Sequence, residues 1–213
     1  TPDDTSLTEC GKSQNRNRDL AGAVKKLQSL GLQVMGGFIV GFDSDDRHTF
    51  DRQIEFIQKS GIVTAMVGLL QAPTGTGLYQ RMLREGRLKE EGYSGDNVDG
   101  ETNIVPMMPA ATLKNGYRKI LDTIYSAKSY TERVMTFLKT YNPARHPVTL
   151  EAQEVLALFR SAWQIGVRGN KGERKEYWRL FFWSLFKHTR KFPLAITFSI
   201  YGYHFRKVNQ LHV

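Results

Sequence analysis

The chain has 213 residues, with 40% hydrophobic and 24% charged side chains, which excludes disorder, collagen-like repeats and a disulfide scaffold. Its net charge is +9, and most of the excess lies in residues 151–213, which hold eleven basic and four acidic side chains. A single cysteine, Cys10, excludes an intrachain disulfide and an all-cysteine metal site built from this chain alone. The first residues do not resemble a signal peptide, and no apolar run reaches the ~18–20 residues of a membrane span.

The N-terminal part alternates helical and strand patterns. Apolar residues recur at helical spacing over residues 15–30, which predicts an amphipathic helix. Residues 33–41 form a nearly continuous apolar run bounded by glycines, typical of a strand buried on both faces of a parallel sheet. A second helix that ends at Gly61 and a second apolar strand over residues 63–70 repeat this unit.

Two consecutive helix–strand units with short connections predict right-handed crossovers and a parallel α/β sheet. Two strands neither close a barrel nor cover their own edges, so the predicted sheet is incomplete. A short helix is expected over residues 78–85 and a loop over residues 92–100. Beyond Ala110 the pattern is helical, and the expected helices are 112–126, 130–141, 149–166, 173–188 and 193–208.

Two glycine-containing motifs follow the predicted strands. The first, residues 36–45, ends in glycine and turns through acidic residues, and in α/β folds ligands bind at this carboxyl end of a strand. Taken alone, it is also explained by a strand that needs space against a helix. The second motif, residues 69–79, enters a helix through a Pro/Gly turn. It lacks the phosphate-loop and dinucleotide glycine patterns, which disfavours both of those enzyme classes.

Together the two motifs closely resemble the fifth and sixth strands of the radical S-adenosylmethionine (SAM) partial barrel. In that family the fifth strand lies against the adenine of SAM, and the backbone at the end of the sixth strand also touches it. At Asp45 the sequence departs from the Gly-Glu pair found in many members. The cofactor-binding positions that the resemblance implies are Gly37, Ile39, Gly41, Asp45, Leu70, Gln71 and Ala72.

The longer pattern runs from the opening residues 1–12 into the helical tail at residues 201–206. It is most similar to the radical SAM subgroup with an N-terminal cobalamin-binding domain and a C-terminal helical domain of unknown function, which includes hopanoid-type methylases. The implied fold class is α/β followed by all-α, with the last strands of a partial (β/α)6 TIM-like barrel and a C-terminal helical domain. The expected domains are the C-terminal part of the barrel (1–91), a connecting loop and helices (92–148), and a basic, aromatic-rich helical region (149–213).

The resemblance implies SAM and a 4Fe–4S cluster as cofactors, and cobalamin as a further one. The family binds its cluster through a Cys-x-x-x-Cys-x-x-Cys loop, which this sequence lacks. The cluster ligands and the cobalamin domain are therefore expected in the missing N-terminal part of the same enzyme. No catalytic or metal-ligating residue is assigned to this chain, and we expect the isolated chain to be inactive.

The acidic loop over residues 95–101 does not fit a calcium-binding loop, because Pro106 stands where a carboxylate is required. A polar loop just past the sixth strand would lie near the mouth of the barrel. Asn97, Asp99 and Asn103 are therefore candidate substrate-pocket residues, and a local Asx turn is the alternative.

Residues 177–187 are rich in aromatic side chains and have basic flanks. A helix buried against the domain explains this pattern. The alternative is an interfacial helix that makes peripheral membrane contact, since Trp and Phe beside Lys and Arg suit the headgroup region. Nucleic-acid binding is disfavoured because no recognised module accompanies the charge.

The expected function is that of a C-terminal portion of a radical SAM enzyme, which contributes adenine-binding strands and substrate-pocket cover for radical methylation of an unactivated carbon. The expected substrate is a small, lipid-like molecule, and the expected location is the cytoplasm, with membrane association as an option. The alternative is a non-catalytic accessory or membrane-docking module without its own cofactor. The sequence leaves the substrate and the use of cobalamin open.

Overall fold

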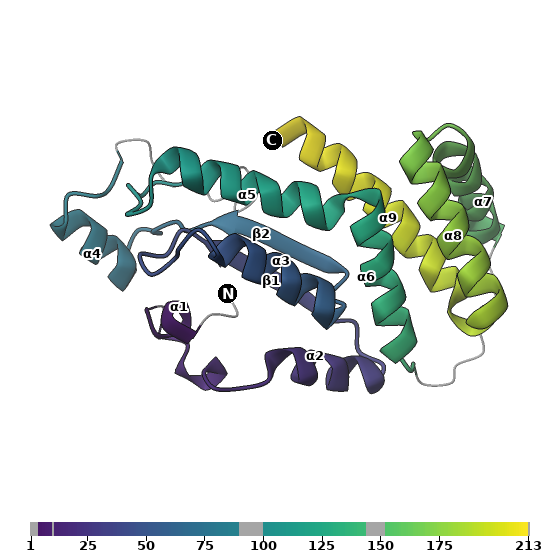
Figure 1. Ribbon diagram of the computed structural model, residues 1–213, viewed down its shortest axis with the longest axis horizontal. Coiled ribbons are helices and arrows are strands. Elements are labelled where there is room, and N and C mark those ends of the chain that lie inside the picture. The colour runs from purple at the N-terminus through teal and green to yellow at the C-terminus, as the bar shows by residue number, and fades with distance from the viewer. Residues whose placement is uncertain (1–3, 10, 90–99, 144–151, 213) are drawn as a thin grey trace.

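The computed structural model describes residues 4–9, 11–89, 100–143 and 152–212. In this part of the chain a two-stranded sheet is flanked by helices, and the last three helices gather at the end of the molecule opposite the short helix α4 (Figure 1). No helix in the described residues is long and apolar enough to cross a membrane.

The order of helices and strands agrees with the sequence prediction, but the bounds differ. The first amphipathic helix begins only at Leu20, because the Asp19 side chain accepts a hydrogen bond from the Gly22 N–H and caps the helix there. A helix at Asp4–Glu9 was not predicted, and a π-helical turn at Ala162–Val167 continues α7. The helices are α1 (Asp4–Glu9), α2 (Leu20–Ser29), α3 (Thr49–Ser60), α4 (Gly77–Arg84), α5 (Ala110–Tyr125), α6 (Ala127–Thr140), α7 (Ala152–Ser161), α8 (Lys171–Lys187) and α9 (Phe192–His212), and the strands are β1 (Met35–Val40) and β2 (Thr64–Leu69).

The two strands pair in parallel, as the helix–strand repeat predicted. Phe38 lies opposite Val67 and Val40 lies opposite Leu69. Apart from an isolated bridge between Leu88 and Ile104, no further strand accompanies them in the described residues. The α/β character of the N-terminal part is thus confirmed, whereas the expected partial barrel is not.

The two faces of the sheet differ in burial. One face packs Phe38 and Val67 into the core formed with α3 and α5. The opposite face is open, with Met35 67%, Ile39 42% and Met66 55% exposed. The prediction that the first strand is buried on both faces is therefore wrong for this chain, because helices cover only one side.

The outer edge of β2 is covered by side chains of the helices that follow. The Tyr125 hydroxyl donates to the Ala65 carbonyl at 2.6 Å, and the Arg133 guanidinium donates to the Val63 carbonyl at 3.3 Å. Among the described residues, no side chain bonds the outer edge of β1 in this way. Because an uncovered strand edge favours pairing, β1 is the side on which the sheet is open to continuation.

Arg133 lies at the junction of α3, α5, α6 and β2 and is fully buried. Besides the Val63 carbonyl, it donates to the Gln58 side-chain oxygen at 2.5 Å and to the Ile124 carbonyl at 2.8 Å. The rings of Tyr125 and Tyr130 lie 5.7 and 5.2 Å from its guanidinium. Burial lowers the pKa of Arg133 to about 10, so the side chain still carries its charge at neutral pH.

Replacing Arg133 with alanine should lower the free energy of unfolding by about 3 kcal/mol, because buried carbonyls lose their donor and a cavity remains. Arg174→Ala, at an exposed position of α8, is the control and should change stability by less than about 0.5 kcal/mol. Urea unfolding followed by circular dichroism measures both variants. Equal losses in the two variants would contradict the assignment of Arg133 as the junction of the core.

Candidate functional site

The carboxyl end of β1 turns sharply at Gly41, whose φ of +105° lies in the region that favours glycine. The Asp45 carboxylate closes this turn by accepting hydrogen bonds from the Gly41 N–H at 2.7 Å and the Phe42 N–H at 3.0 Å. The Ser6 hydroxyl donates to the same carboxylate at 3.1 Å. Burial raises the pKa of Asp45, and the backbone hydrogen bonds oppose that shift. Asp45 is thus engaged with the turn itself.

The carboxyl end of β2 is clamped by the segment 101–104. The Asn103 side chain accepts a hydrogen bond from the Ala72 N–H at 2.8 Å and donates to the Ala72 carbonyl at 2.9 Å. The Gln71 amide donates to the Glu101 carbonyl at 3.1 Å. Asn103 is therefore buried and holds the strand end, while the other two candidate pocket residues, Asn97 and Asp99, lie outside the described residues.

A cluster of charged side chains joins the turn after β1 to the helices beside it. Arg87 binds Asp43 through both terminal nitrogens, at 2.6 and 3.0 Å. Arg81 in α4 donates to Asp43 at 3.1 Å and to Glu9 in α1 at 3.2 Å. The hydrogen bond from Arg87 lowers the pKa of Asp43, so this carboxylate is ionised at neutral pH. We refer to Glu9, Asp43, Arg81 and Arg87 as the charged cluster.

Sequence reasoning missed the charged cluster. Asp43 precedes Arg81 by 38 positions and Arg87 by 44, and each residue type is ordinary on a solvated surface. The only available signal was the acidic turn after the first strand, which the sequence interpretation credited to Asp45. The fold alone brings the four side chains together.

An open hollow of about 380 Å³ lies at the same carboxyl edge of the sheet. Phe42, Leu70 and Leu78 provide apolar walls, and Glu9 and Arg81 of the charged cluster lie at its side. Of the predicted cofactor positions, Leu70 thus lines the hollow. An apolar hollow with a few charged groups at its margin is suited to an organic ring that carries polar substituents.

The open face of β1 belongs to the same side of the sheet as Leu70. Ile39 lies opposite Gly68 in the parallel register, and Leu70 is two residues beyond Gly68, so the side chains of Ile39 and Leu70 share a face. At Gly37 an added Cβ would meet no atom within 4 Å, so the surface beside Ile39 is open. The structure therefore brings Gly37, Ile39 and Leu70 to one surface, whereas Gln71 and Ala72 are buried.

The site has no group of three or more His, Cys, Asp or Glu that could hold a metal ion, and neither has the rest of the described chain. Cys10 lies outside the described residues. What the described residues offer at this edge is a binding surface made of backbone, apolar side chains and fixed charges.

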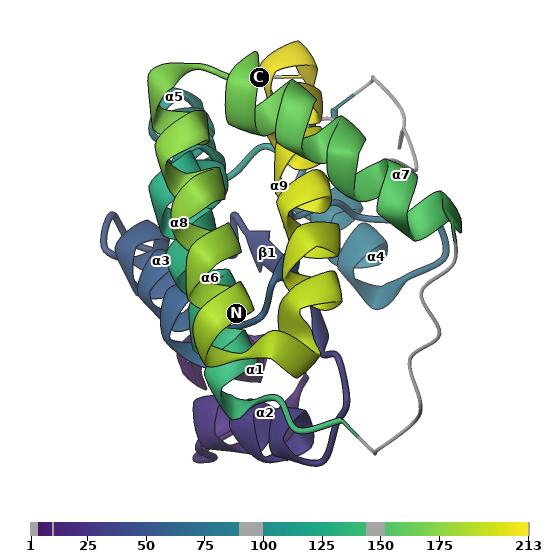
Figure 2. The ribbon, with the colours of Figure 1, turned by 90° about the vertical axis from the view of Figure 1, so that its right-hand side faces the viewer.

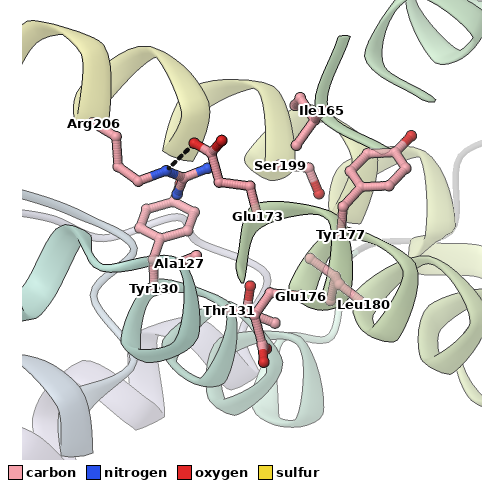
Figure 3. Close-up of a pocket in the computed structure, with 10 residues that line it drawn as sticks. All are labelled: Ala127, Tyr130, Thr131, Ile165, Glu173, Glu176, Tyr177, Leu180, Ser199 and Arg206. Atoms are coloured by element: carbon pink, nitrogen blue, oxygen red, sulfur yellow. Dashed lines mark hydrogen bonds and ion pairs between the residues drawn. The ribbon is translucent and has the colours of Figure 1, made fainter. Parts of the chain in front are cut away.

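A second, much smaller pocket lies between α6, α8 and α9 (Figure 3). The ion pair between Glu173 and Arg206, at 3.1 Å, lies beside the ring of Tyr130. The Tyr130 hydroxyl is buried without a hydrogen-bond partner in the described part of the chain. At about 20 Å³ the pocket has room for roughly one water molecule, so it is too small for an organic substrate.

Comparison with known proteins gives one family and two relatives. The sequence model of the family DUF4070, a domain of unknown function, matches residues 76–213. A protein named as an uncharacterized methyltransferase from Synechocystis sp. is 30% identical over 214 residues, which cover 99% of this chain and 40% of the relative. The hopanoid C-2 methylase of Rhodopseudomonas palustris is 28% identical over 191 residues, 86% of this chain and 34% of the relative. The chain thus spans well under half the length of both relatives, and no solved structure matches it significantly.

Asn103→Ala should free the end of β2. Loss of the amide leaves the buried Ala72 N–H without its acceptor, which costs about 1–3 kcal/mol of stability. Hydrogen exchange at the Ala72 amide should become faster than in Asn142→Ala, the control at an exposed asparagine. Unchanged exchange at Ala72 would show that Asn103 does not hold the strand end.

Proposed function

The chain belongs to the DUF4070 family, and on that premise we propose that it forms the C-terminal portion of a radical SAM methylase in which β1 and β2 pack against the adenine of SAM. The family match and the two relatives confirm the resemblance to methylases with a C-terminal domain of unknown function. The observation that carries the adenine assignment is the shared surface of Gly37, Ile39 and Leu70 beside the hollow.

This surface fits the adenine ring for three physical reasons. Gly37 leaves space for a flat ring to approach the backbone, and Ile39 offers an exposed apolar side chain to its face. Leu70 adds an apolar wall where the strand meets the hollow. In parallel α/β sheets, ligands bind at this carboxyl edge of the strands.

The radical chemistry would come from the bound cofactors, SAM with a 4Fe–4S cluster and cobalamin, while the protein supplies binding, orientation and electrostatics. The charged cluster would fix the turn after β1 against α1 and α4, so that the hollow keeps its shape. With one cysteine in the chain, the cluster ligands would come from the portion of the relatives that this chain does not span.

The open side of the sheet supports the same proposal. Side chains of α5 and α6 cover the outer edge of β2, as expected for the last strand of a sheet, and β1 has no such cover in the described residues. The preceding strands of the barrel would pair with the uncovered edge of β1. The name of one relative, a hopanoid C-2 methylase, favours a lipid-like substrate.

In the complete enzyme, Ile39→Asp should weaken SAM binding by about tenfold or more, because a carboxylate replaces an apolar contact to adenine. Met35→Asp is the matched control, since Met35 lies on the same face of β1 at the opposite end of the strand. Equilibrium dialysis with labelled SAM measures both affinities. Equal affinities would place the adenine elsewhere.

The 213-residue chain by itself should bind no iron–sulfur cluster, because a cluster needs several thiolates and the chain has one cysteine. Anaerobic reconstitution with iron and sulfide, followed by absorption spectroscopy and iron analysis, tests this. A stoichiometric 4Fe–4S spectrum would contradict the division of the cofactor site between this chain and a preceding segment.

A further inference from the structure

The helices α7 and α8 lie at the end of the molecule that faces the viewer in Figure 2, and aromatic side chains of this region are exposed. Phe186 is 77% exposed and Phe182 49% exposed on α8. Phe159 on α7 is 68% exposed, and Trp163, in the π-helical turn after α7, is 60% exposed. Four large aromatic side chains left in water within some thirty residues indicate an interaction surface rather than scattered surface apolar residues.

The aromatic residues on one side of α8 form a continuous strip. Trp178, Phe182 and Phe186 follow each other at four-residue spacing on α8, with ring centroids 5.6 and 6.2 Å apart and nearly parallel planes. Trp178 also donates its indole N–H to the Gly166 carbonyl at 3.0 Å, in the turn that carries Trp163. Trp178 therefore packs against the turn that carries Trp163.

Basic residues continue the same strip. Lys171 and Lys175 precede Trp178 on α8 by seven and three positions, so they lie on the same side of the helix as Phe182. Both lysines are exposed, and no carboxylate in the described residues pairs with them. We call this set the aromatic–basic face, and it consists of Phe159, Trp163, Trp178, Phe182 and Phe186 together with Lys171 and Lys175.

The acidic residues of α8 are turned away from this face. Glu173 is buried in an ion pair with Arg206, and Glu176 is buried in an ion pair with Arg179. The aromatic–basic face is therefore positive and apolar at once, which is the composition that suits the headgroup region of an anionic bilayer.

We propose that the aromatic–basic face docks this chain onto an anionic lipid surface, with α7 and α8 lying in the plane of the headgroups and the exposed Phe and Trp rings inserted among the lipid chains. The positive charge of the aromatic–basic face indicates an anionic lipid surface as its partner. A layer of anionic headgroups supplies the negative charge that Lys171 and Lys175 do not find within the described chain. This inference does not depend on the proposed methylase activity.

The structure also changes which residues should insert. The sequence pattern drew attention to both tryptophans of α8, but Trp178 is half-buried against Gly166 and Trp183 packs against the main core. Phe182 and Phe186 are the aromatic residues of α8 that are exposed to water. The buried-helix interpretation therefore holds for the side of α8 that carries Trp183, and the proposal assigns the membrane contact to the side that carries Phe182 and Phe186.

The test is sedimentation of the 213-residue chain with vesicles of phosphatidylcholine containing phosphatidylglycerol, and with vesicles of phosphatidylcholine alone. The chain should bind the anionic vesicles and lose binding as salt is raised. The double variant Phe182→Ser/Phe186→Ser should bind at least about tenfold more weakly. Its matched control is Leu30→Ser/Met107→Ser, which removes two exposed apolar side chains outside the C-terminal helices and should bind normally.

The charge is tested with Lys171→Ala/Lys175→Ala, which should lower binding to the anionic vesicles by about fivefold for each lysine. Lys25→Ala/Lys26→Ala on α2 is the control for charge alone and should leave binding unchanged. Far-ultraviolet circular dichroism confirms that every variant is folded.

Three results would overturn the proposal. The first would be that the unmodified chain does not sediment with anionic vesicles. The second would be that the two phenylalanine substitutions leave binding unchanged. The third is that the chain self-associates in analytical ultracentrifugation and the Phe182→Ser/Phe186→Ser variant does not, since a second copy would then cover the face.

Discussion

The guanidinium of Arg133 is a buried charge that pairs with no carboxylate among the described residues, and the arrangement of the α/β part depends on how that charge is accommodated. Its donors end on the carbonyl of Ile124 in the last turn of α5 and on the carbonyl of Val63 just before β2. The C-terminal end of a helix carries partial negative charge, and aromatic faces attract cations, so Ile124 and the two flanking tyrosines offset part of the desolvation cost. The charge therefore fixes α6 against α5 and β2.

The same junction sets the limits of the sheet. Tyr125, whose ring lies beside Arg133, also bonds the outer edge of β2 through its hydroxyl. One strand edge is thereby satisfied within the chain. Among the described residues the other edge has no such cover, and Met35, Ile39 and Met66 are exposed on one face. The open side is the side on which the predicted adenine-binding residues Gly37 and Ile39 lie. The covered edge of β2 and the uncovered edge of β1 thus determine on which side of the sheet the site lies.

At the carboxyl edge the strand ends are held by side chains from distant parts of the chain. Asn103 binds both backbone groups of Ala72, and the charged cluster joins α1, the turn after β1 and α4. The Ala72 backbone keeps its position because loss of either hydrogen bond to Asn103 would leave a buried group unsatisfied. The partly buried ion pairs of the charged cluster hold the turn after β1 in the same way. The residues that border the hollow are consequently held by contacts between distant segments of the chain.

The sequence by itself determined the helix–strand order, the parallel pairing of β1 and β2, the helical C-terminal part and the kinship with methylases. These features depend on local periodicity, on glycine positions and on motifs that a short window contains. Only the tertiary structure decided that one face of β1 is open, that Asn103 clamps Ala72, and that Arg87 and Arg81 meet at Asp43. It also separated the buried from the exposed aromatic residues of α8, where apolar side chains occur on every side of the helix. These features depend on contacts between residues that are tens of positions apart, and a linear pattern carries no information about which distant side chains will meet.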